Sequence, residues 1–243
     1  RSSAASDVYK RQHLGISRRF ERIMPILGTS ASSGGRVAPN APTIGTATDV
    51  GTARAYNNGA ATVTFTDNNP TRFATTSFTV TSSPGGFTGT GSSSPITVAG
   101  LASSTSYTFT VTATNAFGTS SASSASNSIT ATTVPQAPTI GTATAGNALA
   151  TVTYTANATG GKAVSAYTAT SSPGSLTGTG ASPITVSSLT NGTAYTFTVT
   201  ATNANGTSAA SSASNSVTPV SPYWIEKATT TIEGAGGYTC LLY

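Results

Sequence analysis

The stretch Ser106–Ile129 reads SYTFTVTATNAFGTSSASSASNSI, and Ala194–Val217 reads AYTFTVTATNANGTSAASSASNSV. In the first of them, Tyr107, Phe109 and Val111 fall on one face of an extended chain and the threonines between them on the other. This alternation with a period of two is typical of a half-buried antiparallel β-strand. The two stretches begin 88 residues apart and contain no charged residue. The sequence therefore predicts that one strand-rich unit is built twice.

The similarity between the two copies extends outward from these stretches. The segment APTIGTAT begins at Ala41 and again at Ala137, and TSSPGGFTGTG at Thr81 returns as TSSPGSLTGTG at Thr170. Self-similarity at a period of this size indicates tandem modules. The offset falls from 96 to 89 residues between these two segments, so the first copy holds seven extra residues, within Asp49–Gly59.

Apolar and polar residues alternate along most of each copy. Turns rich in Pro-Gly, Asn-Gly and serine separate about seven alternating segments per copy, which is typical of a β-sandwich. We therefore predict an all-β protein made of two tandem seven-stranded sandwiches. The linker TVPQAP is short and contains proline, which predicts an end-to-end arrangement with little freedom. Further expected strands are Ala61–Phe65, Ser77–Thr81, Ala150–Tyr154 and Ala166–Thr170.

The chain divides into four expected parts. These are a tail over residues 1–37, a first sandwich over 38–134, a second over 135–220, and the beginning of a truncated further module over 221–243. The terminal peptides RSSAASDVYKRQ and CLLY are similar to translated sequencing-adapter DNA. We therefore expect residues 1–23 to be non-native and the natural protein to start at Met24.

Two tyrosines and the leucines that precede them carry a resemblance to a known family. Leu101 stands six residues before Tyr107, and Leu189 stands six residues before Tyr195. This spacing, within residues 38–220, resembles that of tandem fibronectin type III domains. The resemblance implies that each tyrosine forms a tyrosine corner, in which its hydroxyl bonds back to the upstream backbone.

The copies depart from that family at one core position. Phe65 and Tyr154 stand where the family often has a buried Trp, and we expect each aromatic ring to fill its core. The threonine-rich, nearly uncharged sequence of the two copies is similar to that of fibronectin type III modules in phage and environmental bacterial proteins. The segment MPILGTSAS, from Met24, also resembles the start of phage structural proteins.

The formal charge of +5 belongs to the tail. Residues 1–36 contain seven lysine or arginine residues and two carboxylates, whereas the rest of the chain is close to neutral. A nucleic-acid surface needs clustered cations, so we expect no nucleic-acid partner. No apolar run approaches the length of a membrane span, and we expect no membrane insertion. The single cysteine, Cys240, excludes an intrachain disulfide.

Residues that carry chemistry are scarce in both copies. The second copy has no Asp, Glu, His or Cys, and the first has only Asp49 and Asp67. Hydrolytic catalysis and metal binding each need several such groups in a defined arrangement. We therefore expect no enzymatic activity, no catalytic residue, no metal and no cofactor. The segment Asn157–Val164, NATGGKAV, only partly matches a phosphate-binding loop and is expected to be a hairpin turn.

The extra residues of the first copy supply the candidate contact loop. Its candidate residues are Arg54, Tyr56, Asn57 and Asn58. Loops at the ends of sandwiches commonly carry recognition, although a solvated loop closed by Asn-Gly explains the same residues.

Two functions remain open at this stage. The first is a non-enzymatic structural or adhesive module of a phage virion surface or tail fibre, on the virion or otherwise extracellular. Its partners would be a cell-surface carbohydrate or other virion proteins, and repetition on a multimeric particle would raise avidity. The alternative is a spacer or binding domain of a secreted bacterial enzyme or adhesin.

Overall fold

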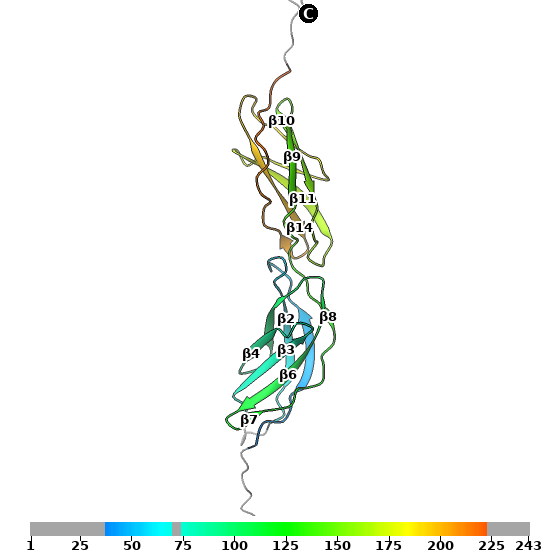
Figure 1. Ribbon diagram of the computed structural model, residues 1–243, viewed down its shortest axis with the longest axis vertical. Coiled ribbons are helices and arrows are strands. Elements are labelled where there is room, and N and C mark those ends of the chain that lie inside the picture. Colours follow the sequence, from blue (N-terminus) through cyan, green and yellow to red (C-terminus); the bar gives the residue numbers. More distant parts are fainter. Residues whose placement is uncertain (1–36, 70–73, 223–243) are drawn as a thin grey trace, which may run out of the picture.

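The computed structural model of the protein describes residues 37–69 and 74–222 (Figure 1). The expectations about residues 1–36 and 223–243 lie outside these residues. Regular structure in the described part of the chain consists of β-strands. They form two sandwiches that lie end to end along the long axis of the molecule, as the linker predicts (Figure 1).

The first sandwich consists of two antiparallel sheets. One sheet has the order β1 (Thr43–Asp49), β2 (Gly59–Thr66), β5 (Ile96–Leu101). The other has the order β4 (Thr88–Gly91), β3 (Ser77–Ser83), β6 (Ser106–Asn115), β7 (Gly118–Thr119), and β8 (Ile129–Thr130) also pairs with β6. The two short strands β7 and β8 are the ends of one final segment that runs along β6.

The second sandwich repeats this strand order. One sheet has the order β9 (Thr139–Ala145), β10 (Leu149–Thr155), β13 (Ile184–Ser187). The other has the order β12 (Thr177–Thr179), β11 (Val164–Ser172), β14 (Thr196–Asn203), β15 (Gly206–Thr207). The predicted all-β fold of two tandem fibronectin type III-like sandwiches is confirmed.

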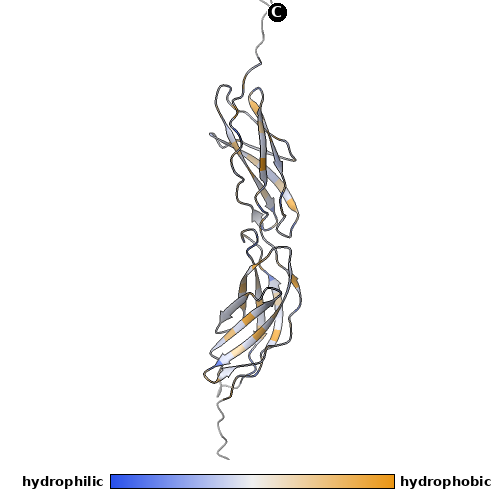
Figure 2. Ribbon diagram, in the orientation of Figure 1, coloured by the Kyte–Doolittle hydropathy of each residue, from blue (hydrophilic) through white to orange (hydrophobic). Residues whose placement is uncertain are grey.

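The alternating residues of the repeated stretch form the two cores. Phe109 and Val111 in β6, like Phe197 and Val199 in β14, are completely buried, and apolar residues of both sandwiches fall on the strands (Figure 2). The threonines between them are half-buried rather than fully solvated. Threonines of neighbouring strands stand opposite them in the ladder, as Thr79 does for Thr112, and so cover part of their surface.

The two predicted tyrosine corners are present. The backbone N–H of Ala102 donates to the Tyr107 hydroxyl at 3.0 Å, and that of Thr190 donates to the Tyr195 hydroxyl at 3.1 Å. Both rings are buried. Each hydroxyl therefore satisfies a backbone donor in the turn before its strand, as the resemblance implies.

A serine ladder forms the final segment of each sandwich. The N–H of Ser123 donates to the carbonyl of Val111 at 2.9 Å, while its Oγ accepts from the N–H of Val111 at 3.0 Å. Every third residue makes this pair of bonds with every second residue of the core strand, so side-chain oxygens replace backbone carbonyls as acceptors. The pairs are Ser120–Ala113, Ser123–Val111, Ser126–Phe109, Ser208–Ala201, Ser211–Val199 and Ser214–Phe197.

An asparagine that follows the ladder ties the two sheets together at one side of each sandwich. Asn127 accepts from the N–H of Ala47 at 2.8 Å and donates to its carbonyl at 3.0 Å. Asn215 makes the same two bonds to Ala143. At the opposite side, a side chain at Gly89 would collide with the backbone carbonyl of Thr97. Glycine is required there because strands β4 and β5 approach each other closely.

Candidate functional site

The titratable groups of the described residues do not assemble into a catalytic or metal-binding cluster. No group of three or more His, Cys, Asp or Glu occurs within 37–69 and 74–222. Asp49 accepts from the N–H of Thr132 at 3.0 Å, and Asp67 accepts from the N–H of Asn69 at 3.1 Å. Both carboxylates therefore have structural partners. In the same part of the chain, no helix has the length and apolar character that a membrane span requires.

The candidate contact loop lies at the junction of the two sandwiches, between β1 and β2 (Figure 1). The N–H of Ala53 donates to the carbonyl of Asn205 in the second sandwich at 2.8 Å. The N–H of Val134 in the linker donates to the carbonyl of Arg54 at 3.0 Å. The loop therefore bonds through its backbone to both parts that it adjoins, and we call residues 50–58 the junction loop.

The four candidate residues of the junction loop occupy different environments. Arg54 and Tyr56 are half-buried, whereas Asn57 and Asn58 are exposed. The Nε of Arg54 donates to the carbonyl of Asn58 at 2.9 Å, and Asn57 accepts from the N–H of Ser103 at 3.1 Å. These bonds hold the loop in shape. Ligand contact by its four residues remains a prediction.

The linker and the second sandwich complete the junction. The N–H of Thr133, which is fully buried, donates to the carbonyl of Gly160 at 2.8 Å. Asn203 donates to the carbonyl of Thr133 at 2.9 Å, and Asn205 donates to Oγ1 of Thr132 at 2.8 Å. The segment NATGGKAV forms a turn in which Gly160 has φ +71°. The predicted hairpin is wrong, because this turn connects β10 to β11, which lie in different sheets. The junction is thus a hydrogen-bonded contact rather than a bare tether.

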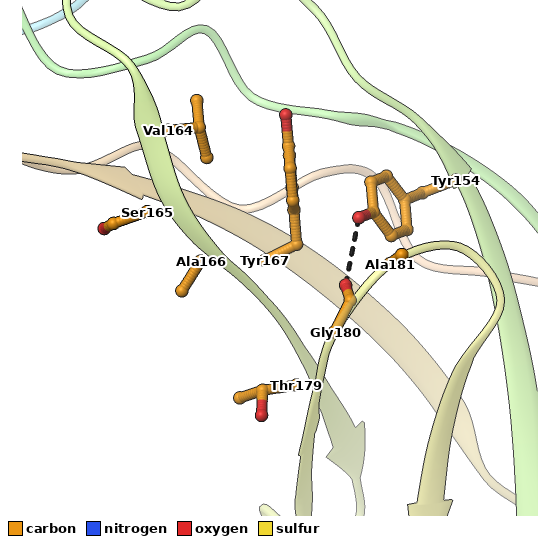
Figure 3. Close-up of a pocket in the computed structure, with 8 residues that line it drawn as sticks. All are labelled: Tyr154, Val164, Ser165, Ala166, Tyr167, Thr179, Gly180 and Ala181. Carbon is orange, nitrogen blue, oxygen red and sulfur yellow. Dashed lines mark hydrogen bonds between the residues drawn. The ribbon is translucent and has the colours of Figure 1, made fainter.

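A hollow of about 400 Å³ opens on the second sandwich around two tyrosines (Figure 3). The ring centroids of Tyr154 on β10 and Tyr167 on β11 lie 4.6 Å apart, with their planes inclined at 34°. The Tyr154 hydroxyl donates to the carbonyl of Gly180 at 3.0 Å (Figure 3). We call this feature the tyrosine hollow; it is also lined by Val164, Ser165 and Thr179.

Burial raises the pKa of the Tyr154 hydroxyl above its ordinary value of 10.0, and the neighbouring Tyr167 raises it further. Both effects disfavour the phenolate, because a negative charge is poorly solvated there and lies beside a second ionisable hydroxyl. Tyr154 is therefore neutral at physiological pH and remains a hydrogen-bond donor to Gly180.

The equivalent place in the first sandwich is closed. Phe65 and Phe78 have ring centroids 4.7 Å apart and are only 7% and 3% exposed. The expectation that an aromatic ring fills the core at both positions is correct for Phe65 and needs correction for Tyr154, which is half-buried at the rim of its core. The Tyr154 hydroxyl finds its polar partner in the carbonyl of Gly180, which lines the hollow, and this bond holds the ring at the rim of the core.

The sequence contains a signal for the tyrosine hollow that individual strand patterns do not reveal. Both rings of one contacting pair change from Phe in the first copy to Tyr in the second. The structure shows that β10 is the equivalent of β2 and that β11 is the equivalent of β3. Only this equivalence reveals that the two added hydroxyls belong to one pair of contacting rings.

Comparison with known proteins adds little about a ligand. No protein-family model and no curated protein sequence matches the chain. Among solved structures, the chain is similar to the FN1-FN3 domains of chicken CNTN1, with 19% sequence identity and a TM-score of 0.41 over 75% of this chain and 67% of that one. Proteins this distant can share a fold and differ in function, which resides in individual sites.

Proposed function

We propose that the chain is a non-enzymatic structural and adhesive module of a phage virion surface or tail-fibre protein, which projects outward and contributes to carbohydrate binding on a host surface. The observation that carries this proposal is the hydrogen-bonded junction. The junction loop bonds to Asn205 and Val134, so the two sandwiches are held end to end as one rod. A rigid rod fixes the position of its far end relative to its attached end, and a projecting appendage requires this.

The surface of the rod suits such a role. Rows of threonine hydroxyls and methyl groups cover the outer faces of the sheets that contain β6 and β14. Hydroxyls of this kind keep an uncharged surface hydrated and can donate to and accept from sugar hydroxyls. Contacts of this type are weak individually, and display of many copies on one particle would convert them into useful avidity.

The rigidity of the rod can be tested on the full chain. We would replace residues 50–58 by the short turn that connects β9 and β10, Gly146–Ala148, and compare the two proteins by residual dipolar couplings. We expect the two sandwiches of the native chain to share one alignment tensor and those of the variant to give two. Two tensors in the native chain would contradict the rod.

Adhesion needs a separate test. We would display the full chain multivalently on beads and measure its retention on a glycan array, with beads carrying an unrelated sandwich domain as control. Retention on a subset of glycans is expected. A rigid chain that is retained by none would instead favour the spacer role in a larger secreted protein.

A further inference from the structure

The two rings of the tyrosine hollow form an apolar platform at the surface. Tyr154 and Tyr167 stack partly on each other at the edge of the second core, with centroids 4.6 Å apart and planes inclined at 34°, and both are only half-buried. The platform is therefore the ring surface that this mutual contact leaves uncovered. The face of an aromatic ring is electron-rich, and it attracts the weakly positive C–H groups of an approaching molecule. A ligand that presents a flat patch of C–H groups therefore suits the platform.

Hydrogen-bonding groups border this platform. Ser165 and Thr179 line the hollow and are exposed, and the Gly180 carbonyl lies at its rim beside the Tyr154 hydroxyl (Figure 3). Hydroxyl groups can donate and accept, whereas the carbonyl can only accept. The hollow thus combines an apolar face with a polar border, the arrangement by which small-molecule sites orient a ligand.

The hollow contains no charged side chain. None of its lining residues is Asp, Glu, His, Lys or Arg, and Lys162 is the only charged residue between positions 135 and 220. A carboxylate, sulfate or phosphate would lose hydration there without gaining an ionic partner. Lack of charge therefore favours a neutral ligand.

We infer that the tyrosine hollow binds a neutral hexopyranose unit of a carbohydrate. A pyranose ring presents C–H groups on its face and hydroxyls around its edge, which matches the platform and its border. The hollow of about 400 Å³ also falls in the size range of small-molecule sites. This inference rests on the proposed adhesive role, because it names the place and the ligand class through which that role operates.

A proline-rich peptide is the competing ligand for a tyrosine pair. Such a peptide adopts an extended helix that rises about 3.1 Å per residue and docks along a groove. The tyrosine hollow is a single depression on one edge of a sandwich, bordered by hydroxyls, and so fits one sugar ring better. The peptide becomes an outcome of the test.

The test is a titration of the full chain with cellobiose, lactose and maltose, followed by amide chemical shifts. We expect at least one of these neutral disaccharides to shift the amides of residues 164–167 and 179–181, with a Kd in the millimolar range, as a ligand with about a dozen contacting atoms allows. The equivalent amides around Phe65 and Phe78 should not move, because that pair is closed.

Three variants measure which side chains contribute to the affinity for the sugar. Tyr167→Ala removes one of the two stacked rings and should weaken binding about tenfold or more. Thr179→Ala changes an exposed hydroxyl with little risk to folding, and should weaken binding by a smaller factor. Phe117→Ala, which removes an exposed aromatic ring from the first sandwich, is the matched control and should leave binding unchanged.

Several results would overturn the inference. They are shifts confined to the junction loop, binding that Tyr167→Ala and Thr179→Ala both leave intact, shifts at the hollow with a proline-rich peptide alone, and no shift at the hollow with any of the three sugars. If the beads still adhere to glycans in the last case, adhesion stands and only the hollow is excluded as its site. If neither binding occurs, the adhesive role fails as well.

Discussion

Each of the two sandwiches has an equivalent core, a tyrosine corner, a serine ladder and an asparagine (Asn127 or Asn215) that ties its two sheets together. The sandwiches differ in two places. The first has the long junction loop between β1 and β2, whereas β9 and β10 are joined by a short turn. The second has the half-buried pair Tyr154 and Tyr167, whereas the first has buried phenylalanines. Features common to both copies are enough to form the fold, so the differences are free to serve other purposes. The first copy braces the junction, and the second exposes a hollow.

The largest expected effect tests whether the two cores are equivalent. Phe109→Ala and Phe197→Ala each remove a fully buried ring and should lower the free energy of unfolding of their own sandwich by about 3–5 kcal/mol. Calorimetry of the full chain should show one thermal transition moving in each variant. If both transitions moved equally in either variant, the two sandwiches would unfold as one unit.

The serine ladders should differ in strength. Ser211 is buried and Ser123 is half-buried, although both accept from a valine N–H of the core strand. Ser211→Ala leaves a buried donor unsatisfied and should cost about 1–3 kcal/mol. Ser123→Ala should cost less, because water can reach the N–H that it frees.

Denaturant unfolding of the two serine variants measures this difference. Ser124→Ala, an exposed serine next to the ladder in the sequence, is the control and should be nearly neutral. Equal losses in all three variants would mean that serine composition, rather than the ladder bonds, stabilises the final segment.

The tyrosine corners should contribute equally in the two copies. Tyr107→Phe and Tyr195→Phe remove the acceptor for a turn N–H at 3.0 Å and 3.1 Å and leave the buried ring in place. Each should cost about 0.5–1.5 kcal/mol, measured by denaturant unfolding. A much larger loss in one copy would show that its corner also orders the neighbouring turn.

The smallest expected effect concerns the pH dependence of the tyrosine hollow. The pKa of Tyr154 is raised in the folded protein, so the unfolded chain releases this proton first as the pH rises. The resulting stability is fully present below the ordinary pKa of 10.0 and is lost above it. Relative to Tyr154→Phe, the native chain should therefore lose stability as the pH rises past 10.0.

Denaturant unfolding of the native chain and Tyr154→Phe on both sides of this pH measures the difference. Tyr167→Phe removes the neighbouring hydroxyl and should reduce the pH dependence without abolishing it, because burial is the larger cause. Parallel pH profiles for the native chain and Tyr154→Phe would contradict the raised pKa.

Local patterns were sufficient to predict most of the fold. The alternation in YTFTVTA identifies the core strand and its buried face, because side chains of a strand point alternately to opposite sides. The spacing from Leu101 to Tyr107 predicts the tyrosine corner, whose bond spans only five residues. Comparison of the two offsets also reveals the extra loop, since insertions shift one copy against the other.

The sequence by itself therefore determined the strands, which follow from short-range periodicity. It also determined the two repeated units and their end-to-end order, which follow from the internal repeat and the short linker. Only the tertiary structure showed that Asn127 clamps Ala47 from 80 residues away, that the junction loop meets Asn205, and that Tyr154 and Tyr167 share one open hollow. Such contacts depend on how two sheets and two sandwiches are placed in space. No periodic pattern encodes that placement, because each contact joins residues that are distant along the chain.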